Sequence, residues 1–424
     1  MREFKRRDFL KVAASTAALS AAGCATTASA KGRVVVIGGG FGGATAAKYI
    51  RMWDPGIAVT LVERNAEFVS CPISNLVLAG YSTMQEITHG YDGLRRHGVQ
   101  VVRDDAVAID AAKKTVRLAR GGDLAYDRLV VSPGIDFTFN EVAGYEAAMG
   151  TGRVLHAWKA GQQTVDLRRQ LEQMRDGGVY ILSIPVAPYR CPPGPYERVC
   201  QVADYFKRAK PRSKIIVLDS NPDITSKKGL FLQSWDGPYK GLIDYQPNSE
   251  LEDVDAKGMT LKLTFGSVKG DVLNVVPPHR AGDIAQKAGL INANQRWCTI
   301  DWLTCESTAV KGIHVLGDAT LSAPAMPKSG SMANQHGKVA AAAIAALLKG
   351  ESVSRNPVIM NTCYSMVDGR SAMHVTSIHK YDAGQKTLVP VKGAGGVSPK
   401  ATELEGTYAW GWARNIWADS LGSV

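Results

Sequence analysis

Three glycines with a fixed spacing are the first residues whose types suggest a chemistry. They follow the apolar run Val34–Ile37 in the order Gly38-x-Gly40-x-x-Gly43. In a turn from a strand to a helix, the first glycine permits the tight bend, the second lets the backbone approach a pyrophosphate, and the third allows close helix–strand packing. Glu63 ends a second apolar run twenty residues after the last glycine, where it can accept a ribose hydroxyl. The pattern predicts a dinucleotide-binding site, and an unrelated glycine-rich turn is the weaker alternative.

Cysteines are the second group with chemical potential, and beyond Cys24 the chain contains six. In an oxidising compartment such residues form disulfides. None lies in a CxxC pair and no CxxCH motif occurs, so the chain carries no c-type haem of its own. No spacing suggests zinc and the eight histidines are dispersed, so we expect no metal site. The six cysteines are Cys71, Cys191, Cys200, Cys298, Cys305 and Cys363.

Buried parallel strands must position these residues. Beside the glycines we expect a strand over 34–37, a helix that opens at Ala44 and a strand over 58–62. Much later in the chain, an apolar strand ends in Gly317-Asp318. In flavin enzymes with two dinucleotide domains, an aspartate at such a strand end holds the ribityl chain. The helix predicted to follow, over 331–348, has a positive N-terminal dipole that could stabilise charge on a reduced flavin ring.

A second α/β unit is predicted from a strand over 178–183, a helix over 196–207 and a strand over 214–219. The turn after the first of these strands should be another glycine-rich phosphate loop if the unit binds a nicotinamide cofactor. Instead, residues 184–195 contain five prolines. Proline has no backbone donor and a fixed φ, so this loop cannot cradle a pyrophosphate. We therefore expect the domain shape without a nicotinamide site.

The fold class expected is α/β, with two Rossmann-like dinucleotide-binding domains, the second without a nicotinamide site, and a C-terminal α+β domain. A chain of 424 residues is long enough for two or three domains. Near its end, four aromatic residues suggest an interface, although such clusters most often form core: Tyr408, Trp410, Trp412 and Trp417. The expected segments are 1–30 (signal peptide), 31–148 (first part of the cofactor domain), 149–267 (second Rossmann-like domain), 268–350 (second part of the cofactor domain) and 351–424 (C-terminal interface domain).

Composition limits the function classes. Hydrophobic residues make up 45% and charged residues 21%, as in a globular protein. The net charge of +11 is scattered along the chain, so we expect no nucleic-acid binding, and part of the charge could favour an acidic partner surface. No apolar run after the first thirty residues reaches about 18 residues, so we expect no stable membrane insertion.

The first thirty residues read as an export signal. Arg6-Arg7 and the flanking residues resemble a twin-arginine motif, and a short apolar stretch and an Ala28-Ser29-Ala30 cleavage site follow. A lipoprotein signal that ends at Cys24 is the alternative. The twin-arginine route exports folded proteins, so we expect a periplasmic protein that receives its cofactor before export.

Taken together, the motifs resemble the flavoprotein subunit of flavocytochrome c sulfide dehydrogenase, nearly end to end. That family belongs to the glutathione-reductase-like flavoproteins, close to sulfide:quinone oxidoreductases. The resemblance implies FAD as cofactor, sulfide as substrate and a separate c-type cytochrome subunit as electron acceptor. The motifs that carry it are VVVIGGGFGGATAAKYIR, SCPISNLVLAG, YRCPPGPYER, VVPPHRAGDIAQKAGL, IHVLGDA and MPKSGSMANQHGKVAAA.

The resemblance also assigns roles to individual residues. Cys71 is expected to bind FAD covalently through a thioether to the 8α-methyl group. Cys191 and Cys363 are expected to form a redox disulfide beside the flavin, a structural disulfide being the alternative. Glu197 resembles an acid–base carboxylate, and an exposed helix glutamate is the alternative. For Lys328 the alternatives are offsetting flavin charge and a solvated cap. The cofactor site expected from the motifs and the resemblance comprises Gly38, Gly40, Gly43, Glu63, Arg64, Cys71, Gly317, Asp318 and Lys328.

Two departures from the family leave alternatives open. Cys200 and Cys305 are not expected to be cysteine in the family, whereas Cys298 fits its pattern. With the roles above, three thiols remain, so at least one is free or intermolecular.

Two other functions remain possible for the sequence. A sulfide:quinone oxidoreductase would need an amphipathic membrane-facing surface, of which residues 407–424 show only a weak form. A non-catalytic accessory electron-transfer flavoprotein of a sulfur-oxidising complex is the third possibility.

Overall fold

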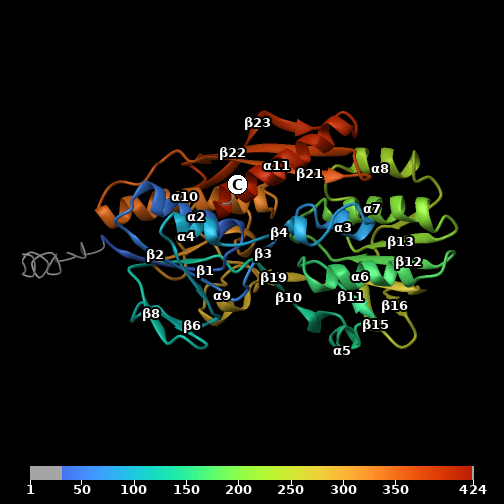
Figure 1. The fold of residues 1–424 in the computed structure, drawn as a ribbon, viewed down its shortest axis with the longest axis horizontal. Helices are drawn as coiled ribbons and strands as arrows, with labels where there is room; N and C mark the ends of the chain where they lie inside the picture. Colours follow the sequence, from blue (N-terminus) through green and yellow to red (C-terminus); the bar gives the residue numbers. More distant parts are fainter. Residues whose placement is uncertain (1–30, 423–424) are drawn as a thin grey trace, which may run out of the picture.

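The computed structural model describes residues 31–422. The predicted signal segment, with Cys24 and the twin-arginine motif, lies outside the described residues. In Figure 1 the cofactor unit occupies the left of the molecule, the second α/β unit occupies the right, and the C-terminal strands cross the top. The expected α/β class with a C-terminal α+β domain is confirmed.

Five parallel strands form the sheet of the cofactor unit. One of them comes from residues far along the chain, so two separated segments build this sheet. Helices α2 (Phe41–Trp53) and α10 (Gly330–Lys349) pack against each other beside the sheet (Figure 1). The strands, in order across the sheet, are β20 (Ile313–Val315), β9 (Arg128–Val131), β1 (Arg33–Ile37), β2 (Ala58–Glu63) and β5 (Gln100–Arg103).

The register of this sheet brings the ends of four strands together. Ile37 pairs with Val62 on one side and with Val131 on the other, and Val315 pairs with Val131. Since the strands are parallel, the residues that follow each of them emerge at the same edge. Ligands bind at the carboxyl edge of such sheets. The edge therefore collects Gly38 and Asp318 although 280 residues separate them in the sequence.

The second unit also has a five-stranded parallel sheet, covered by helices α6 (Gln162–Gln173), α7 (Gly194–Ala209) and α8 (Lys228–Asp236). Strand β18 lies inside this sheet and pairs with β12. The unit therefore extends past the boundary expected at residue 267. The strands, in order, are β11 (Val154–Leu155), β18 (Val272–Val275), β12 (Val179–Ile184), β13 (Lys214–Asp219) and β14 (Ile243–Gln246).

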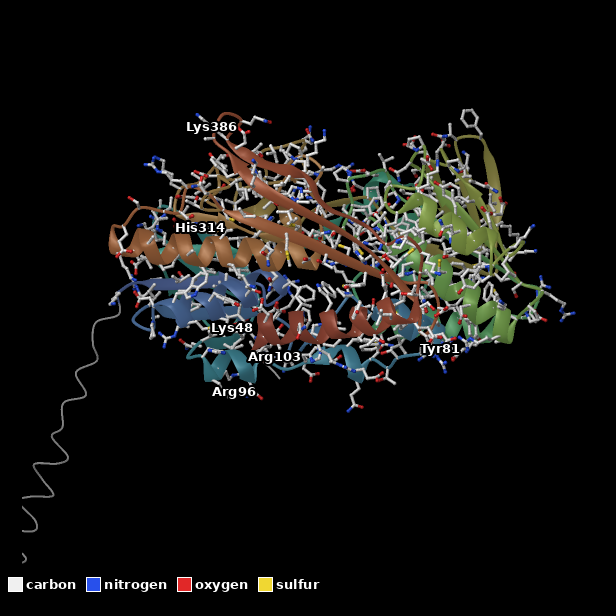
Figure 2. All side chains as sticks on the ribbon, turned by 90° about the horizontal axis from the view of Figure 1, so that it is seen from above. Lys48, Tyr81, Arg96, Arg103, His314 and Lys386 are labelled. Atoms are coloured by element: carbon white, nitrogen blue, oxygen red, sulfur yellow. The ribbon has the colours of Figure 1, made fainter. Side chains whose placement is uncertain are left out.

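The C-terminal part consists of an antiparallel sheet and a long helix. The strands are β21 (Val358–Met366), β22 (Ala372–Asp382) and β23 (Thr387–Val397), and the helix is α11 (Glu403–Leu421). Lys386, in the turn from β22 to β23, projects from the edge of the molecule (Figure 2). Lys48 of α2 donates to the carbonyl oxygens of Ala418 and Asp419, at 3.2 and 2.8 Å, which holds the end of α11 against the cofactor unit.

Shorter elements complete the two α/β units. Three antiparallel strands follow β5: β6 (Ala106–Asp110), β7 (Thr115–Leu118) and β8 (Asp123–Ala125). No helix within residues 31–422 combines the length and apolarity that a membrane span requires. The remaining elements are β3 (Phe68–Val69), α3 (Ser74–Ala79), η1 (Gln85–Ile87), β4 (Thr88–His89), α4 (Asp92–Arg96), β10 (Ile135–Phe137), η2 (Phe139–Glu141), α5 (Tyr145–Gly150), β15 (Leu251–Asp255), β16 (Thr260–Leu263), β17 (Gly266–Lys269), β19 (His279–Ala281), α9 (Asp283–Lys287) and η3 (Gly317–Ala319).

Candidate functional site

A cavity of about 670 Å³ opens where the two α/β units and the C-terminal part meet. This volume is typical of sites for small molecules and cofactors. Ten of the twelve residues predicted from the sequence line it, and Gly43 and Lys328 lie outside its lining. The ten are Gly38, Gly40, Glu63, Arg64, Cys71, Cys191, Glu197, Gly317, Asp318 and Cys363.

The glycine loop forms one end of the cavity. Each of its three positions requires or permits glycine for a different local reason. Gly38 has φ +96°, and a Cβ there would lie 2.3 Å from the carbonyl oxygen of Ser132. A Cβ on Gly43 would lie 1.9 Å from the carbonyl oxygen of Gly38, so only glycine fits at this contact. A Cβ on Gly40 would meet no protein atom within 4 Å, because this residue faces the cavity. The N-terminus of α2, with no acidic side chain in its first turn, is open to a phosphate there.

Glu63 and Arg64 continue the lining from the end of β2. The Glu63 carboxylate accepts hydrogen bonds from the backbone N–H groups of Gly39 at 2.7 Å and Asn65 at 2.8 Å. The side-chain amide of Asn65 also donates to Oε1 at 2.8 Å, so Oε2, which accepts only from Gly39, keeps a lone pair for a further donor. Arg64 forms an exposed ion pair with Asp105 at 3.0 Å. The acid is therefore fixed in place by the loop that it adjoins.

Asp318 lines the cavity with a carboxylate oxygen that can accept a hydrogen bond from a hydroxyl group of a ligand. Its Oδ1 atom is buried and has no hydrogen-bond partner in the described part of the chain. Burial raises the pKa of this carboxyl group. Buried polar atoms are rarely left without a partner, so a ligand group is expected to donate here. A hydroxyl of the FAD ribityl chain has the required chemistry, and the residues present therefore fit FAD.

Lys328 lies one layer behind the cavity wall instead of in it. Its ammonium group donates to the carbonyl oxygens of Asp318, at 3.1 Å, and Thr320, and lies 3.6 Å from the centre of the Trp297 ring. The side chain is only 4% exposed, so it is not a solvated cap residue either. Burial lowers its pKa to about 8. Backbone carbonyls hold the ammonium group behind the wall, and its role in offsetting flavin charge remains a prediction.

Three cysteines from separate segments reach the cavity. Cys71 lies between β3 and α3, with its Sγ 3.9 Å from the carbonyl oxygen of Trp158. Cys191 lies in the proline-rich loop at φ +59°, and Cys363 lies on β21. All three are partly exposed and carry free thiols. Burial raises the pKa of the Cys191 thiol, and charge on Cys363 raises it further, so the two thiols are electrostatically close. Their disulfide remains a prediction.

Glu197 lies beside these two thiols in the first turn of α7. Its side chain is only 8% exposed, which excludes the alternative of an exposed helix glutamate. Oε1 accepts a hydrogen bond from the backbone N–H of Met366 at 3.1 Å. Burial raises the pKa of its carboxyl group. A buried carboxyl group that lines the cavity can hold or accept a proton next to a reacting sulfur.

The other three cysteines of the described chain are buried away from the cavity lining. Cys200 and Cys298 are 0% exposed and Cys305 is 1% exposed. The Trp235 indole N–H donates to the Cys200 sulfur at 3.3 Å. Burial raises the pKa of all three thiols, which makes them poor nucleophiles. Their environment is that of packing residues.

In the second unit, the acid at the strand end is already engaged. Asp219 ends β13 as Glu63 ends β2, but it is 0% exposed. Its carboxylate accepts from the hydroxyls of Tyr196 at 2.7 Å and Tyr245 at 3.0 Å, and from the backbone N–H of Asn221. The position that would meet a ribose in a nicotinamide site is therefore satisfied by the protein's own donors.

Several site residues gave no signal in the sequence. Arg198 is 3% exposed, and its guanidinium donates to Asn75 Oδ1 and to two carbonyl oxygens, which ties α7 to the start of α3. It stacks over the Trp158 ring at 4.9 Å. Lys227 is also buried, next to Cys363. Charged residues at such places read as exposed helix or loop positions, and only the tertiary contacts distinguish them.

The C-terminal aromatic residues divide between different roles. Trp417 is 5% exposed, and its indole N–H donates to Ser70 Oγ at 2.9 Å, one residue before Cys71. Trp412 lines the cavity. Tyr408 is 53% exposed. Only the last of these three faces outward as an interface would require.

Three families match separate parts of the chain. "Sulfide dehydrogenase [flavocytochrome c] flavoprotein chain, central" covers residues 164–277, and "Flavocytochrome c sulphide dehydrogenase, flavin-binding" covers residues 355–421. "Pyridine nucleotide-disulphide oxidoreductase" covers residues 32–170.

Individual relatives agree with these families. A sulfide dehydrogenase [flavocytochrome c] flavoprotein chain of Chlorobaculum thiosulfatiphilum is 67% identical over 45 residues, which are 11% of this chain and 94% of that sequence. Mitochondrial sulfide:quinone oxidoreductase of Mus musculus is 21% identical over 335 residues, 74% of this chain and 71% of that one. The structure of sulfide:quinone oxidoreductase from Aquifex aeolicus has a TM-score of 0.75 at 18% identity, with 92% of each chain covered. That last likeness shows the shared fold.

Proposed function

The chain belongs to the family of flavocytochrome c sulfide dehydrogenase flavoprotein chains, and on that premise we propose that it oxidises sulfide through a Cys191–Cys363 disulfide. As a member of this family it is an FAD-containing oxidoreductase. The proposal adds the redox disulfide, covalent attachment of FAD at Cys71, and a c-type cytochrome as electron acceptor.

One observation carries the proposal: Cys71, Cys191 and Cys363 line a single cavity whose other end is the glycine loop. They come from the cofactor unit, the second unit and the C-terminal sheet, respectively. Packing alone gives no reason for three partly exposed cysteines from distant segments to surround one space. A covalent attachment point and a reactive pair give such a reason.

The residues around the cavity would hold FAD in a defined order. The N-terminus of α2 beside Gly40 would bind the pyrophosphate, Glu63 a ribose hydroxyl, and Asp318 the ribityl chain. Cys71 would form the thioether. When bound, FAD accepts the two electrons that sulfide oxidation releases. A covalent tie would keep the cofactor in a compartment without a free FAD pool.

Sulfide oxidation would begin at the cysteine pair. Hydrosulfide ion is small and nucleophilic, and disulfide exchange requires an anion that reaches an accessible sulfur. Attack breaks the bond between the two cysteines, forms a persulfide on one, and leaves a thiolate on the other. Glu197, with its raised pKa, is placed to accept or return the proton of the incoming sulfide. A second sulfide then releases the bound sulfur toward polysulfide or elemental sulfur.

A separate c-type cytochrome is proposed as the electron acceptor because the chain has no CxxCH motif for a haem of its own. The net charge of +11 and the exposed Tyr408 of α11 are candidate features of the contact. Export to the periplasm by the twin-arginine route is part of the same proposal, since soluble c-type cytochromes meet their partners there.

Anaerobic mixing of the purified protein with sulfide tests the activity. We expect the bound flavin to bleach and then to reoxidise on addition of oxidised cytochrome c. Reoxidation by a soluble quinone and not by cytochrome c would favour sulfide:quinone oxidoreductase activity. A flavin that stays oxidised under excess sulfide would favour the accessory, non-catalytic role.

A further inference from the structure

A buried lysine lies directly behind the reactive cysteine pair. Lys227 precedes α8 at φ +53° and is 8% exposed. Its ammonium group donates to the carbonyl oxygen of Cys363 at 3.2 Å, to Ser365 Oγ at 2.7 Å and to the carbonyl oxygen of Met373 at 3.5 Å. These three acceptors use its three donors, and all of them are neutral. Within residues 31–422, Lys227 takes part in no ion pair.

Such a cation is costly unless an anion lies near it. The groups whose negative charge reaches Lys227 are Cys363 of β21, Glu197 of α7, Cys191 of the proline-rich loop and, last, Glu405 of α11. Cys363 exerts the largest of these effects. A closed disulfide carries no charge, whereas an opened one leaves a thiolate. Opening the disulfide with the charge on Cys363 would therefore give Lys227 its missing partner.

The surroundings of Cys363 also contain a hydroxyl that suits an anion. Burial raises the pKa of the Cys363 thiol, and Lys227 and the hydroxyl of Ser329 oppose this rise. In the thiol form, the sulfur donates to Asn361 Oδ1 at 3.2 Å. Ser329 is the N-cap of α10, a helix of 20 residues with no acidic side chain in its first turn. Helix N-termini stabilise thiolates, and nearby lysines do the same.

Cys191 has the opposite surroundings. It precedes α7, but three residues of that helix start are prolines without an N–H group: Pro192, Pro193 and Pro195. The first turn of α7 contains Glu197, whose charge raises the pKa of the Cys191 thiol, while Arg190 and Lys227 oppose it more weakly. A negative charge is therefore less favourable on Cys191 than on Cys363.

We propose that Lys227 is a positioning residue that stabilises Cys363 as the leaving thiolate and thereby directs sulfide to Cys191. This inference rests on the proposed redox disulfide. In the step, hydrosulfide attacks Cys191 Sγ and a new S–S bond forms there, while the Cys191–Cys363 bond breaks. Its electron pair stays on Cys363 Sγ. The product is a Cys191 persulfide and a Cys363 thiolate, so charge and atoms balance without a further reactant.

Trapping of the persulfide tests the direction of attack. The oxidised holoenzyme is mixed anaerobically with one equivalent of sulfide, quenched with iodoacetamide and mapped by peptide mass spectrometry. We expect the extra sulfur atom on the peptide with Cys191 and simple alkylation on the peptide with Cys363. An extra sulfur found mainly on Cys363 would overturn the proposal.

The pH dependence of alkylation in the chemically reduced holoenzyme tests the role of Lys227. In the unmodified protein, Cys363 should react with a lower midpoint pH than Cys191. Lys227→Met removes the positive charge and should raise the Cys363 midpoint by about one pH unit or more. One unit corresponds to a tenfold change in the thiolate equilibrium. The Cys191 midpoint should move less. Lys227→Arg keeps the positive charge and should bring the Cys363 midpoint most of the way back to its value in the unmodified protein.

Lys48→Met is the matched control. Lys48 has the same 8% exposure and also donates to backbone carbonyl oxygens, but these belong to Ala418 and Asp419 of α11 and not to Cys363. It should leave both midpoints unchanged. Equal shifts of the Cys363 midpoint in Lys227→Met and Lys48→Met would show that Lys227 has only a structural role. If Lys227→Met does not fold, the order of the two midpoints in the unmodified protein decides the matter, and Cys191 titrating first overturns the proposal.

The two measurements also separate this inference from the proposed function. If the proposed disulfide is wrong, sulfide adds no sulfur to either cysteine and the oxidised protein shows two free thiols. The alkylation midpoints still report on Lys227 in that case. If only the present inference is wrong, a persulfide forms on Cys363 in place of Cys191, or the alkylation midpoints do not change when Lys227 is substituted.

Discussion

The Glu63 carboxylate accepts a hydrogen bond from the backbone N–H of Gly39 over 2.7 Å, so the end of β2 holds the glycine loop that follows β1. The same carboxylate also accepts from Asn65. The loop is therefore set by the protein before any phosphate reaches it. A preformed loop lowers the entropic cost of binding the cofactor.

The first prediction compares two glycines of this loop. Gly43→Ala places a Cβ 1.9 Å from the carbonyl oxygen of Gly38, so the turn must move, at a cost of about 1–3 kcal/mol in unfolding free energy. Gly40→Ala meets no protein atom and should leave that free energy nearly unchanged, but it should lower flavin content because its methyl group enters the phosphate position. Urea unfolding of flavin-free protein, prepared in a Cys71→Ser background, and flavin-to-protein ratios measure both effects. Equal behaviour of the two variants would contradict this reading of the loop.

The second prediction concerns the attachment of FAD. In the unmodified protein, acid precipitation should leave the flavin on the peptide that contains Cys71. Cys71→Ser should release it to the supernatant, because the other contacts of the cavity are non-covalent. Cys191→Ser serves as the control and should keep the flavin in the precipitate. Flavin retained by Cys71→Ser would place the covalent bond elsewhere.

The third prediction separates reactive from packing cysteines. Cys191→Ser or Cys363→Ser should each slow reduction of the flavin by sulfide at least about a hundredfold, since either change removes the disulfide and its exchange reaction. Cys200→Ala should retain sulfide reduction because its sulfur is buried against Trp235. Stopped-flow absorbance under anaerobic conditions measures the rates. Dithionite should reduce the flavin in every variant, which shows that the cofactor itself is intact.

The fourth prediction follows from the raised pKa of Glu197. Burial raises this pKa above the ordinary value of 4.5, so the folded state binds the proton more tightly than the unfolded state does. The unfolding free energy contributed by this group is therefore greatest below pH 4.5 and falls as pH rises through the raised pKa. Glu197→Gln cannot ionise and should gain stability relative to the unmodified protein as pH rises across that window. Urea unfolding of both proteins at several pH values measures the difference, and two parallel curves would show that Glu197 has no raised pKa.

Local patterns were sufficient to predict much of the fold and most of the cavity lining. The strand, glycine turn and acid at residues 34–63 form one continuous unit whose geometry depends on neighbours in the sequence. The same holds for strand β13, which was predicted with the boundaries observed. Helix α2 begins at Phe41, three residues before the expected opening at Ala44, because its first turn lies inside the glycine motif.

Tertiary contacts decided the rest. For Lys328 the sequence left a role in offsetting flavin charge and a solvated cap as alternatives, and two carbonyl oxygens and the Trp297 ring bury it behind the wall, which excludes the solvated cap. Lys227 follows a serine and precedes another lysine, a pattern typical of a solvated loop, and contacts with β21 and β22 of the C-terminal part bury it. The pattern of one segment does not reveal which charges on two other segments will face it in the folded protein.

The position of α11 has a consequence for the timing of assembly. This helix docks on α2 through Lys48 and on the Cys71 loop through Trp417, and it supplies Trp412 to the cavity. A ribosome adds about 5–20 residues per second, so tens of seconds separate synthesis of the glycine loop from synthesis of α11. A nascent chain can therefore form the phosphate end of the pocket early, but it cannot enclose a cofactor until its last helix has been released. Cofactor capture is in this sense delayed until α11 has been made, and a chain truncated before residue 403 should fold in part and stay colourless.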